Sequence, residues 1–147
     1  MNAFKVIVLA GFVCGTVDLL VTSTLFKLKG GAYERLFQFI ASGALGARAF
    51  TSGKATAAAG VLLHFFIAFS VAAIYYAASL RLNILLMHAF FSGIVYGAAV
   101  HLVMSLIVVP LSAAPKRAFS LAAFLTQLVV HMFFVGLPIA YIVARFS

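Results

Sequence analysis

The sequence predicts an all-α membrane protein with four transmembrane helices and one short amphipathic helix. Of the 147 residues, 66% are hydrophobic and only 8% are charged. That composition leaves too little polar surface to cover a water-soluble globule of this size. The apolar residues also form four continuous runs of about 20 residues or more, the length that crosses a hydrocarbon layer about 30 Å thick as a helix. We therefore expect one four-helix transmembrane domain over residues 1–147.

The four transmembrane helices are expected at about residues 6–26, 56–80, 84–111 and 119–143. Because the runs are continuous rather than alternating with a period of two, the sequence argues against a closed barrel of strands. In the last connection, Pro110 and Pro115 favour the end of one helix and the start of the next. Pro138 is expected to kink the fourth helix and to free a backbone carbonyl.

The long first connection predicts an amphipathic helix at about residues 32–46, within "YERLFQFIASGALG". Its apolar residues recur at helical spacing, and its polar residues fall on the other faces. The apolar set is Tyr33, Leu36, Phe37, Ile40 and Ala44, and the polar set is Glu34, Arg35, Gln38 and Ser42. We expect this helix to lie at the membrane surface, with Ser42 exposed on it.

The distribution of Lys and Arg predicts the orientation, since cytoplasmic loops collect these residues. The connections after the first and third helices carry Lys27, Lys29, Arg35, Arg48, Lys54, Lys116 and Arg117. The opposite side carries only Lys5, Arg81 and Arg145. Both termini should therefore face away from the cytoplasm. The formal net charge of +8 is mainly this orientation signal, and no segment supplies the soluble basic surface that a nucleic-acid partner needs.

The two halves of the chain share short motifs in the same order. "GFVCGTVDLL" is similar to "GIVYGAAVHLV", "RAFT" to "RAFS", and "LLHFFIAF" to "VVHMFFVGLP". This order suggests a tandem duplication of a two-helix unit. The repeats would be parallel and related by an axis along the membrane normal, as in some transporters. The duplication pairs His64 with His131 and Asp18 with His101.

Four ionisable residues within the apolar runs are the candidate site residues, together with Gln127. Asp18, His64, His101 and His131 each lie roughly 12–18 Å from the cytoplasmic end of their helices, at 1.5 Å per residue. Small residues that mark helix packing follow the same faces; these are Gly11, Gly15, Gly60, Gly93 and Gly97. We therefore expect the four ionisable side chains to point inward and to converge within about 10 Å, because a charge facing lipid is costly.

His88 is not expected to belong to this set. It precedes His101 by thirteen residues in the sequence, which corresponds to about 20 Å along a helix. The residue is therefore predicted to lie near the opposite membrane surface.

Several functions fit an Asp/His layer inside a membrane. Asp18, His64, His101 and His131 are the residue types that bind Zn²⁺ or another divalent transition metal. Histidine and aspartate can also relay protons, because histidine changes charge near neutral pH, and such a relay would suit a transporter. Two histidines could ligate a haem b iron from both faces. Alternatively, the protein is an accessory subunit in which hydrogen bonds among these groups fix the helix packing.

No catalytic site is predicted, so an enzyme is the less favoured class. Only two acids occur, Asp18 and Glu34, and the chain lacks a Walker loop, a dinucleotide fingerprint and a G-x-S-x-G motif. The glycine stripes on the first and third helices suggest a homodimer in the lipid bilayer.

The strings "FQFIASGALG", "LLHFFIAF", "LVMSLIVVPLSA" and "VVHMFFVGLPIA", in this order, give the chain a family resemblance from Gly11 onward. It resembles a group of small bacterial inner-membrane proteins with four predicted helices and no assigned activity. The resemblance implies a bacterial inner membrane and a compact four-helix fold, and with the distribution of Lys and Arg this predicts that both termini are periplasmic. It implies no catalytic residues.

Overall fold

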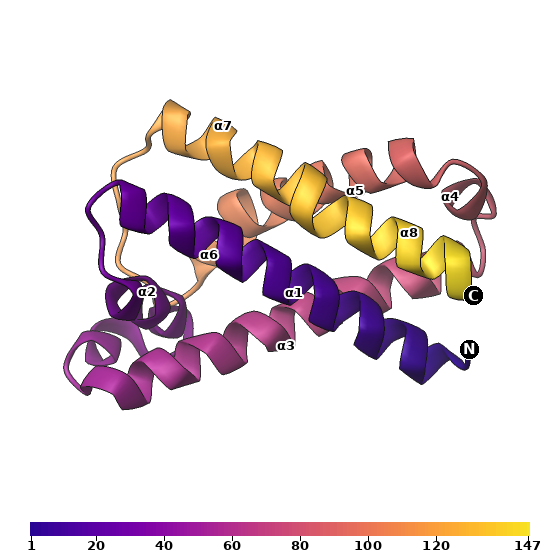
Figure 1. The fold of residues 1–147 in the computed structure, drawn as a ribbon. Helices are drawn as coiled ribbons and strands as arrows, with labels where there is room; N and C mark the ends of the chain where they lie inside the picture. The colour runs from indigo at the N-terminus through magenta and orange to yellow at the C-terminus, as the bar shows by residue number, and fades with distance from the viewer.

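The computed structural model describes residues 1–147 as an all-α protein without strands (Figure 1). Four helical segments are long and apolar enough to cross a membrane. They are α1 (Ala3–Leu28), α3 (Gly53–Ser79), a third span (Ala89–Leu111) and a fourth span (Leu121–Phe146). Only 30 of the 147 residues are buried, and many large apolar side chains are exposed along the spans. A multi-pass membrane protein explains this surface, because lipid covers those side chains.

The third and fourth spans each contain a π-helical segment. The third consists of α5 (Ala89–Val103), η2 (Met104–Val108) and α6 (Val109–Leu111). The fourth consists of α7 (Leu121–Val130), η3 (His131–Gly136) and α8 (Leu137–Phe146).

The expected third helix over 84–111 is interrupted near its start. A short helix, α4 (Ile84–Met87), ends at His88, whose φ of −122° and ψ of 51° are not helical. The Tyr75 hydroxyl at the end of α3 donates a hydrogen bond to the Leu85 carbonyl oxygen at 3.1 Å. This bond joins α4 to α3, and the membrane span begins at Ala89 rather than at Ile84. His88 lies exposed at this break, outside the cluster of the other histidines.

Both chain ends lie at the same end of the bundle, which we call the terminal end (Figure 1). There the amino group of Met1 donates to the carbonyl oxygen of Phe146 at 3.0 Å. The opposite loop end holds the connections after α1 and after the third span. The Ala113 amide donates to the Gly43 carbonyl oxygen at 3.0 Å and joins these two connections.

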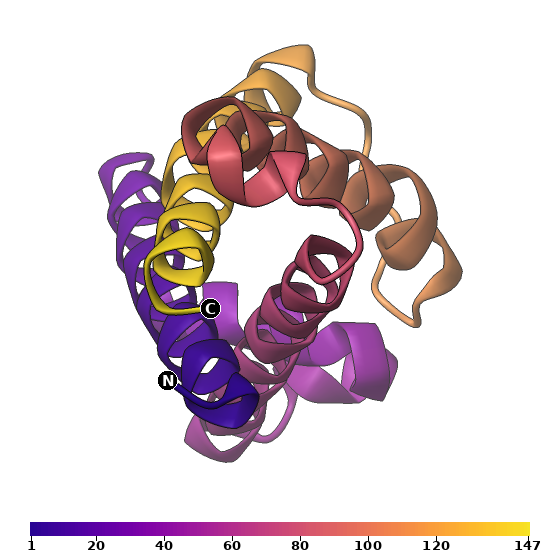
Figure 2. The same cartoon turned by 90° about the vertical axis from the view of Figure 1, so that its right-hand side faces the viewer.

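The four spans are not equally close to one another. Helix α1 contacts α3 on one side and the fourth span on the other, and α5 contacts the fourth span. Viewed from the terminal end, α1 and α8 lie beside each other, whereas α3 and α5 occupy separate positions (Figure 2). A hydrogen bond of 2.6 Å from the Tyr96 hydroxyl to the Val71 carbonyl oxygen bridges α5 and α3.

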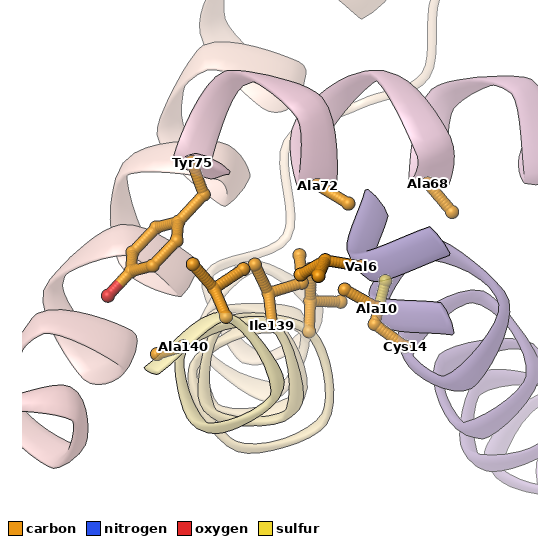
Figure 3. Packing of buried hydrophobic residues seen from close by; sticks show 10 residues of the cluster. Val6, Ala10, Cys14, Ala68, Ala72, Tyr75, Ile139 and Ala140 are labelled. Carbon is orange, nitrogen blue, oxygen red and sulfur yellow. The ribbon is translucent and has the colours of Figure 1, made fainter. Parts of the chain in front are cut away.

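The apolar core lies in the terminal half of the bundle, and Figure 3 shows how its side chains pack. It is built where α1, α3 and the fourth span meet. Its members are Val6, Ala10, Cys14, Ala68, Ala72, Tyr75, Val135, Ile139, Ala140 and Val143. Space remains between the helices in both halves, and at the terminal end an apolar groove of about 430 Å³ lies between α3, α4 and α5.

Glycines set the close helix contacts inside the chain. A Cβ at Gly11 would overlap Phe69 of α3, and one at Gly97 would overlap the carbonyl oxygen of His131. At Gly93, the carbonyl oxygen of Gly136 would be 3.0 Å from such an atom. The glycines of α1 and α5 therefore pack against other helices of the same chain. They give no argument for a homodimer.

The amphipathic helix α2 (Tyr33–Leu45) is followed by the 3₁₀ segment η1 (Gly46–Phe50). Helix α2 crosses α3 closely at Gly60, where a Cβ would overlap the Phe37 carbonyl oxygen. The face that meets α3 differs from the expected one: Gln38 and Ser42 are buried, whereas Tyr33 and Ala44 are exposed.

Leu36 of the expected apolar set stays buried, so the face is rotated, and this rotation has a physical reason. Close packing at Gly60 favours small residues such as Ala41 and Ser42 on the facing side. The buried polar groups also find hydrogen-bond partners. Gln38 donates to the Gly53 carbonyl oxygen at 3.2 Å, and Ser42 donates to the Phe39 carbonyl oxygen at 2.6 Å. The expectation that Ser42 is an exposed helix-surface serine is therefore wrong.

Candidate functional site

The four ionisable residues of the spans lie at one depth. Asp18 and His101 each precede the loop end of their spans, Leu28 and Leu111, by ten residues. His64 follows Gly53 by eleven residues and His131 follows Leu121 by ten. At 1.5 Å per residue, all four are about 15 Å from the loop end. The depth is common because the spans alternate in direction, so that residues before the end of one span and after the start of the next lie at the same level.

Three of the four side chains line a single pocket of about 140 Å³. Asp18 comes from α1, His64 from α3 and His131 from the start of η3. Helix α2 contributes Ile40, and the remaining lining residues are Cys14, Gly15, Ile67, Ala68, Val71, Val100, Met104 and Val135. A water molecule requires about 10–15 Å³ of such space. The pocket therefore has room for several waters among three ionisable groups.

His101 lies behind this pocket rather than in its lining. The residue is 5% exposed, and its ring centroid is 5.1 Å from that of His131 and 4.7 Å from that of Phe124. Its Nε2 atom is buried without a hydrogen-bond partner. The expected layer of four groups is thus divided into three that share the pocket and one that packs against His131.

The hydrogen bonds of His64 and His131 define their tautomers. Nε2 of His64 lies 2.8 Å from the Gly15 carbonyl oxygen, and Nδ1 of His131 lies 2.8 Å from the Gln127 carbonyl oxygen. A carbonyl oxygen only accepts, so each of these nitrogens carries the hydrogen. In the neutral rings, Nδ1 of His64 and Nε2 of His131 are then free acceptors. Gln127 contributes its backbone carbonyl, and its side-chain amide makes no hydrogen bond.

Asp18 is 8% exposed, and its Oδ1 atom is buried without a hydrogen-bond partner. No hydrogen bond joins any two of Asp18, His64, His101 and His131. Two further buried hydroxyls on α1, those of Thr22 and Ser23, are also without partners. Buried polar groups are normally satisfied by protein or by water. Hydrogen bonds to water would satisfy these atoms.

Thr22 and Ile40 are two residues of the site region that sequence reasoning missed. Thr22 follows Asp18 by four residues and so shares its helix face. That spacing was readable in the sequence. Ile40 reaches the pocket only because α2 packs against α3 at Gly60, and no local pattern encodes that contact.

Both π-helical segments begin at residues that line the pocket, η3 at His131 and η2 at Met104. Each precedes a proline, Pro138 and Pro110, at the start of the following α-helix. Proline has no N–H, and its ring clashes with the carbonyl four residues earlier, so the preceding turn widens. The irregularity expected from Pro138 thus takes the form of a π-helix, a feature often found at functional sites.

The ligand arrangement does not fit a metal or a haem. No three His, Cys, Asp or Glu side chains are grouped so that they could hold a metal ion, whereas zinc sites use three or four protein ligands. The pocket of about 140 Å³ is also smaller than the range of about 300–1,000 Å³ typical of ligand and cofactor sites. The geometry therefore supports neither a metal site nor a haem site.

Searches with the chain found no matching family model, no matching curated protein and no matching solved structure. The structure has four long apolar helices. This architecture is all that it shares with the group of bacterial inner-membrane proteins that the sequence resembles.

Proposed function

We propose that the protein takes up and releases protons at the pocket formed by Asp18, His64 and His131, as part of transport across a bacterial inner membrane. The observation that carries the proposal is the meeting of three ionisable side chains, from three spans, in one pocket about 15 Å deep. Ionisable residues are expensive inside a membrane and usually mark ion or substrate pathways.

The surroundings of the pocket support access from one side. Toward the loop end, the unpartnered hydroxyl of Thr22 lies one helical turn beyond Asp18 on the same face of α1. Toward the terminal end, the apolar core and the hydrogen bond from Tyr96 to Val71 come next to the pocket. The apolar groove of about 430 Å³ beyond them shares no lining residue with the pocket. A proton from the loop side reaches the Asp18 carboxylate through water, and the lone pairs of His64 and His131 accept protons at the same level. With the termini periplasmic, the open side is cytoplasmic.

The proposal includes the internal duplication. Gly15 of α1 packs against Phe65 of α3, and Gly97 of α5 packs against Met132 of the fourth span. Phe65 and Met132 each follow one of the paired histidines, His64 and His131, by one residue. The helix pairs therefore pack at corresponding positions, which is the result expected of two parallel repeats.

An accessory subunit with a hydrogen-bonded polar core is the less favoured function. That function requires bonds among Asp18 and the histidines, whereas each histidine bond runs to a backbone carbonyl and Asp18 Oδ1 has no partner.

A homodimer remains a proposal on one ground, that four helices are too few to surround a wide pore. Native mass measurement in lipid nanodiscs would test it, and a monomer alone would contradict it.

Proton flux into vesicles tests the function. Purified protein is reconstituted with an internal pH dye, and a potassium diffusion potential drives proton entry. We expect the wild-type protein to acidify the interior and Asp18→Asn to behave like protein-free vesicles. Glu34→Gln is the matched control, because it removes the other acid, which lies exposed on α2. Equal flux in the wild type and in Asp18→Asn, or no flux in the wild type, would contradict the proposal.

A further inference from the structure

A second, apolar groove is continuous with the Asp/His pocket. It has a volume of about 330 Å³ and lies between α2, α3 and the loop half of the third span. Leu63, Phe66 and Val108 are typical of its lining. Three residues, Ile40, Ile67 and Met104, line both the groove and the pocket. The two spaces therefore form one amphipathic site, with a polar inner part and an apolar outer part.

The groove is open to the lipid. Phe66 on its wall is 68% exposed and Val109 is 39% exposed. The groove forms where α3 and the third span separate, because α1 and the fourth span hold these two helices on opposite sides of the bundle. Its volume falls in the range of about 300–1,000 Å³ that is typical of small-molecule sites lined by apolar side chains. A ligand dissolved in the bilayer can thus enter from the side.

The polar part of this site offers hydrogen-bond acceptors. Nε2 of His64 and Nδ1 of His131 already donate to backbone carbonyls, so their remaining ring nitrogens accept. The carboxylate of Asp18, a residue that lines the pocket, also accepts. A complementary ligand must therefore carry several N–H or O–H donors, and a positive charge matches the carboxylate of Asp18.

We propose that the site binds a long-chain primary alkylammonium, with the ammonium group in the Asp/His pocket and the alkyl chain in the groove. An ammonium group supplies a positive charge and three donors, which match the carboxylate of Asp18 and, through water in the pocket, the acceptors of His64 and His131. This inference rests on the proposed function in that it names a ligand class for the same pocket.

The main alternative ligand is a fatty acid whose head group lies at the loop end and whose chain points toward the pocket. The guanidinium of Arg117 lies 3.9 Å from the ring centroid of Phe39, which lines the groove at the loop end. A carboxylate could pair with Arg117 while its chain pointed toward the pocket. The acceptors around Asp18 would then stay without partners, so the alkylammonium is the better match to the whole site.

Photo-crosslinking in nanodiscs of zwitterionic lipid tests the proposal. The probe is a long-chain primary alkylamine with a diazirine at the end of its chain, and the matched probe is a fatty acid of the same length and tag. We expect the amine to label peptides containing Leu63 and Val108. Asp18→Asn should abolish this labelling, whereas Ser70→Ala, a change on α3 outside the site, should leave it intact. Ala44→Trp, which fills the groove and leaves Asp18 in place, should also reduce labelling.

Each other outcome overturns the inference. Labelling by the fatty acid that equals that of the amine and disappears in Arg117→Gln would establish the fatty acid as the ligand. Amine labelling that survives Asp18→Asn or Ala44→Trp would place the probe elsewhere, and no labelling by either probe would remove the site. Because proton flux is measured without amine, flux that persists when amine labelling is absent contradicts this inference and leaves the proposed function standing.

Discussion

His64 of α3 donates its Nε2 hydrogen to the carbonyl oxygen of Gly15 in α1, across 2.8 Å. The absence of a side chain at Gly15 permits this approach, since a Cβ there would already be 3.0 Å from Ala68 and Phe65. The same bond fixes the tautomer of His64 and leaves Nδ1 as an acceptor at the level of Asp18. Helix packing and the chemistry of the pocket therefore depend on one contact.

Replacing His64 should separate function from stability. His64→Gln loses the imidazole that accepts a proton, so we expect proton flux to be lost. Buried hydrogen bonds in membrane bundles average only about 0.6 kcal/mol, so the free energy of unfolding should change by about that amount or less. Flux assays and unfolding in mixed micelles measure the two effects. A large loss of stability with flux retained would identify a structural histidine instead.

The close contact at Gly97 should not tolerate a methyl group. Gly97→Ala introduces a Cβ that overlaps the His131 carbonyl oxygen and Met132, and overpacking of this kind costs about 1–3 kcal/mol. Gly43→Ala is the matched control, because a Cβ there would have no neighbour closer than Ser112 at 3.9 Å. Thermal unfolding in detergent compares the two variants. Equal melting temperatures would contradict the packing described for α5 and η3.

Pro138 should control the position of His131. In Pro138→Ala, a new N–H can bond to the Phe134 carbonyl, so η3 should return to regular α-helix and rotate His131 relative to α8. We expect reduced proton flux in a protein that remains folded. Pro115→Ala, in the connection outside any helix, should have no effect on flux. Flux in Pro138→Ala equal to wild type would show that the π-helix is not needed.

Orientation can be measured in intact cells. In a Cys14→Ala background, Ser147→Cys should react with a membrane-impermeant thiol reagent added outside the cytoplasmic membrane. Arg48→Cys should react only after permeabilisation. This expectation follows from the excess of Lys and Arg at the loop end. The reverse pattern of labelling would invert the topology and would place the open side of the pocket on the periplasmic face.

Sequence reasoning predicted the parts of this protein that depend on composition and helical periodicity. The four apolar spans, the existence of α2 and the common depth of Asp18, His64, His101 and His131 all follow from such patterns. The break at His88 did not, and the bond from the Tyr75 hydroxyl that joins α4 to α3 beside it is a contact made only after folding.

The arrangement within the site also required the structure. Periodicity placed Gln38 and Ser42 on the outer face of α2, whereas close packing at Gly60 turned them inward. The separation of His101 from the other three groups depends on how α5 and η3 rotate against each other. Gly97 and the π-helix at His131 decide that rotation, and neither is visible as a hydrophobic pattern.

The central claim is that Asp18, His64 and His131 share one hydrated pocket within the membrane, and cysteine reactivity tests it most directly. In vesicles of the Cys14→Ala protein, Asp18→Cys, His64→Cys and His131→Cys are each exposed to a small water-soluble thiol reagent, with Ala72→Cys from the buried core as the reference. We predict that the three pocket cysteines react much faster than Cys at position 72. Reaction of all four at the same slow rate would show that no water reaches this layer and would contradict the account.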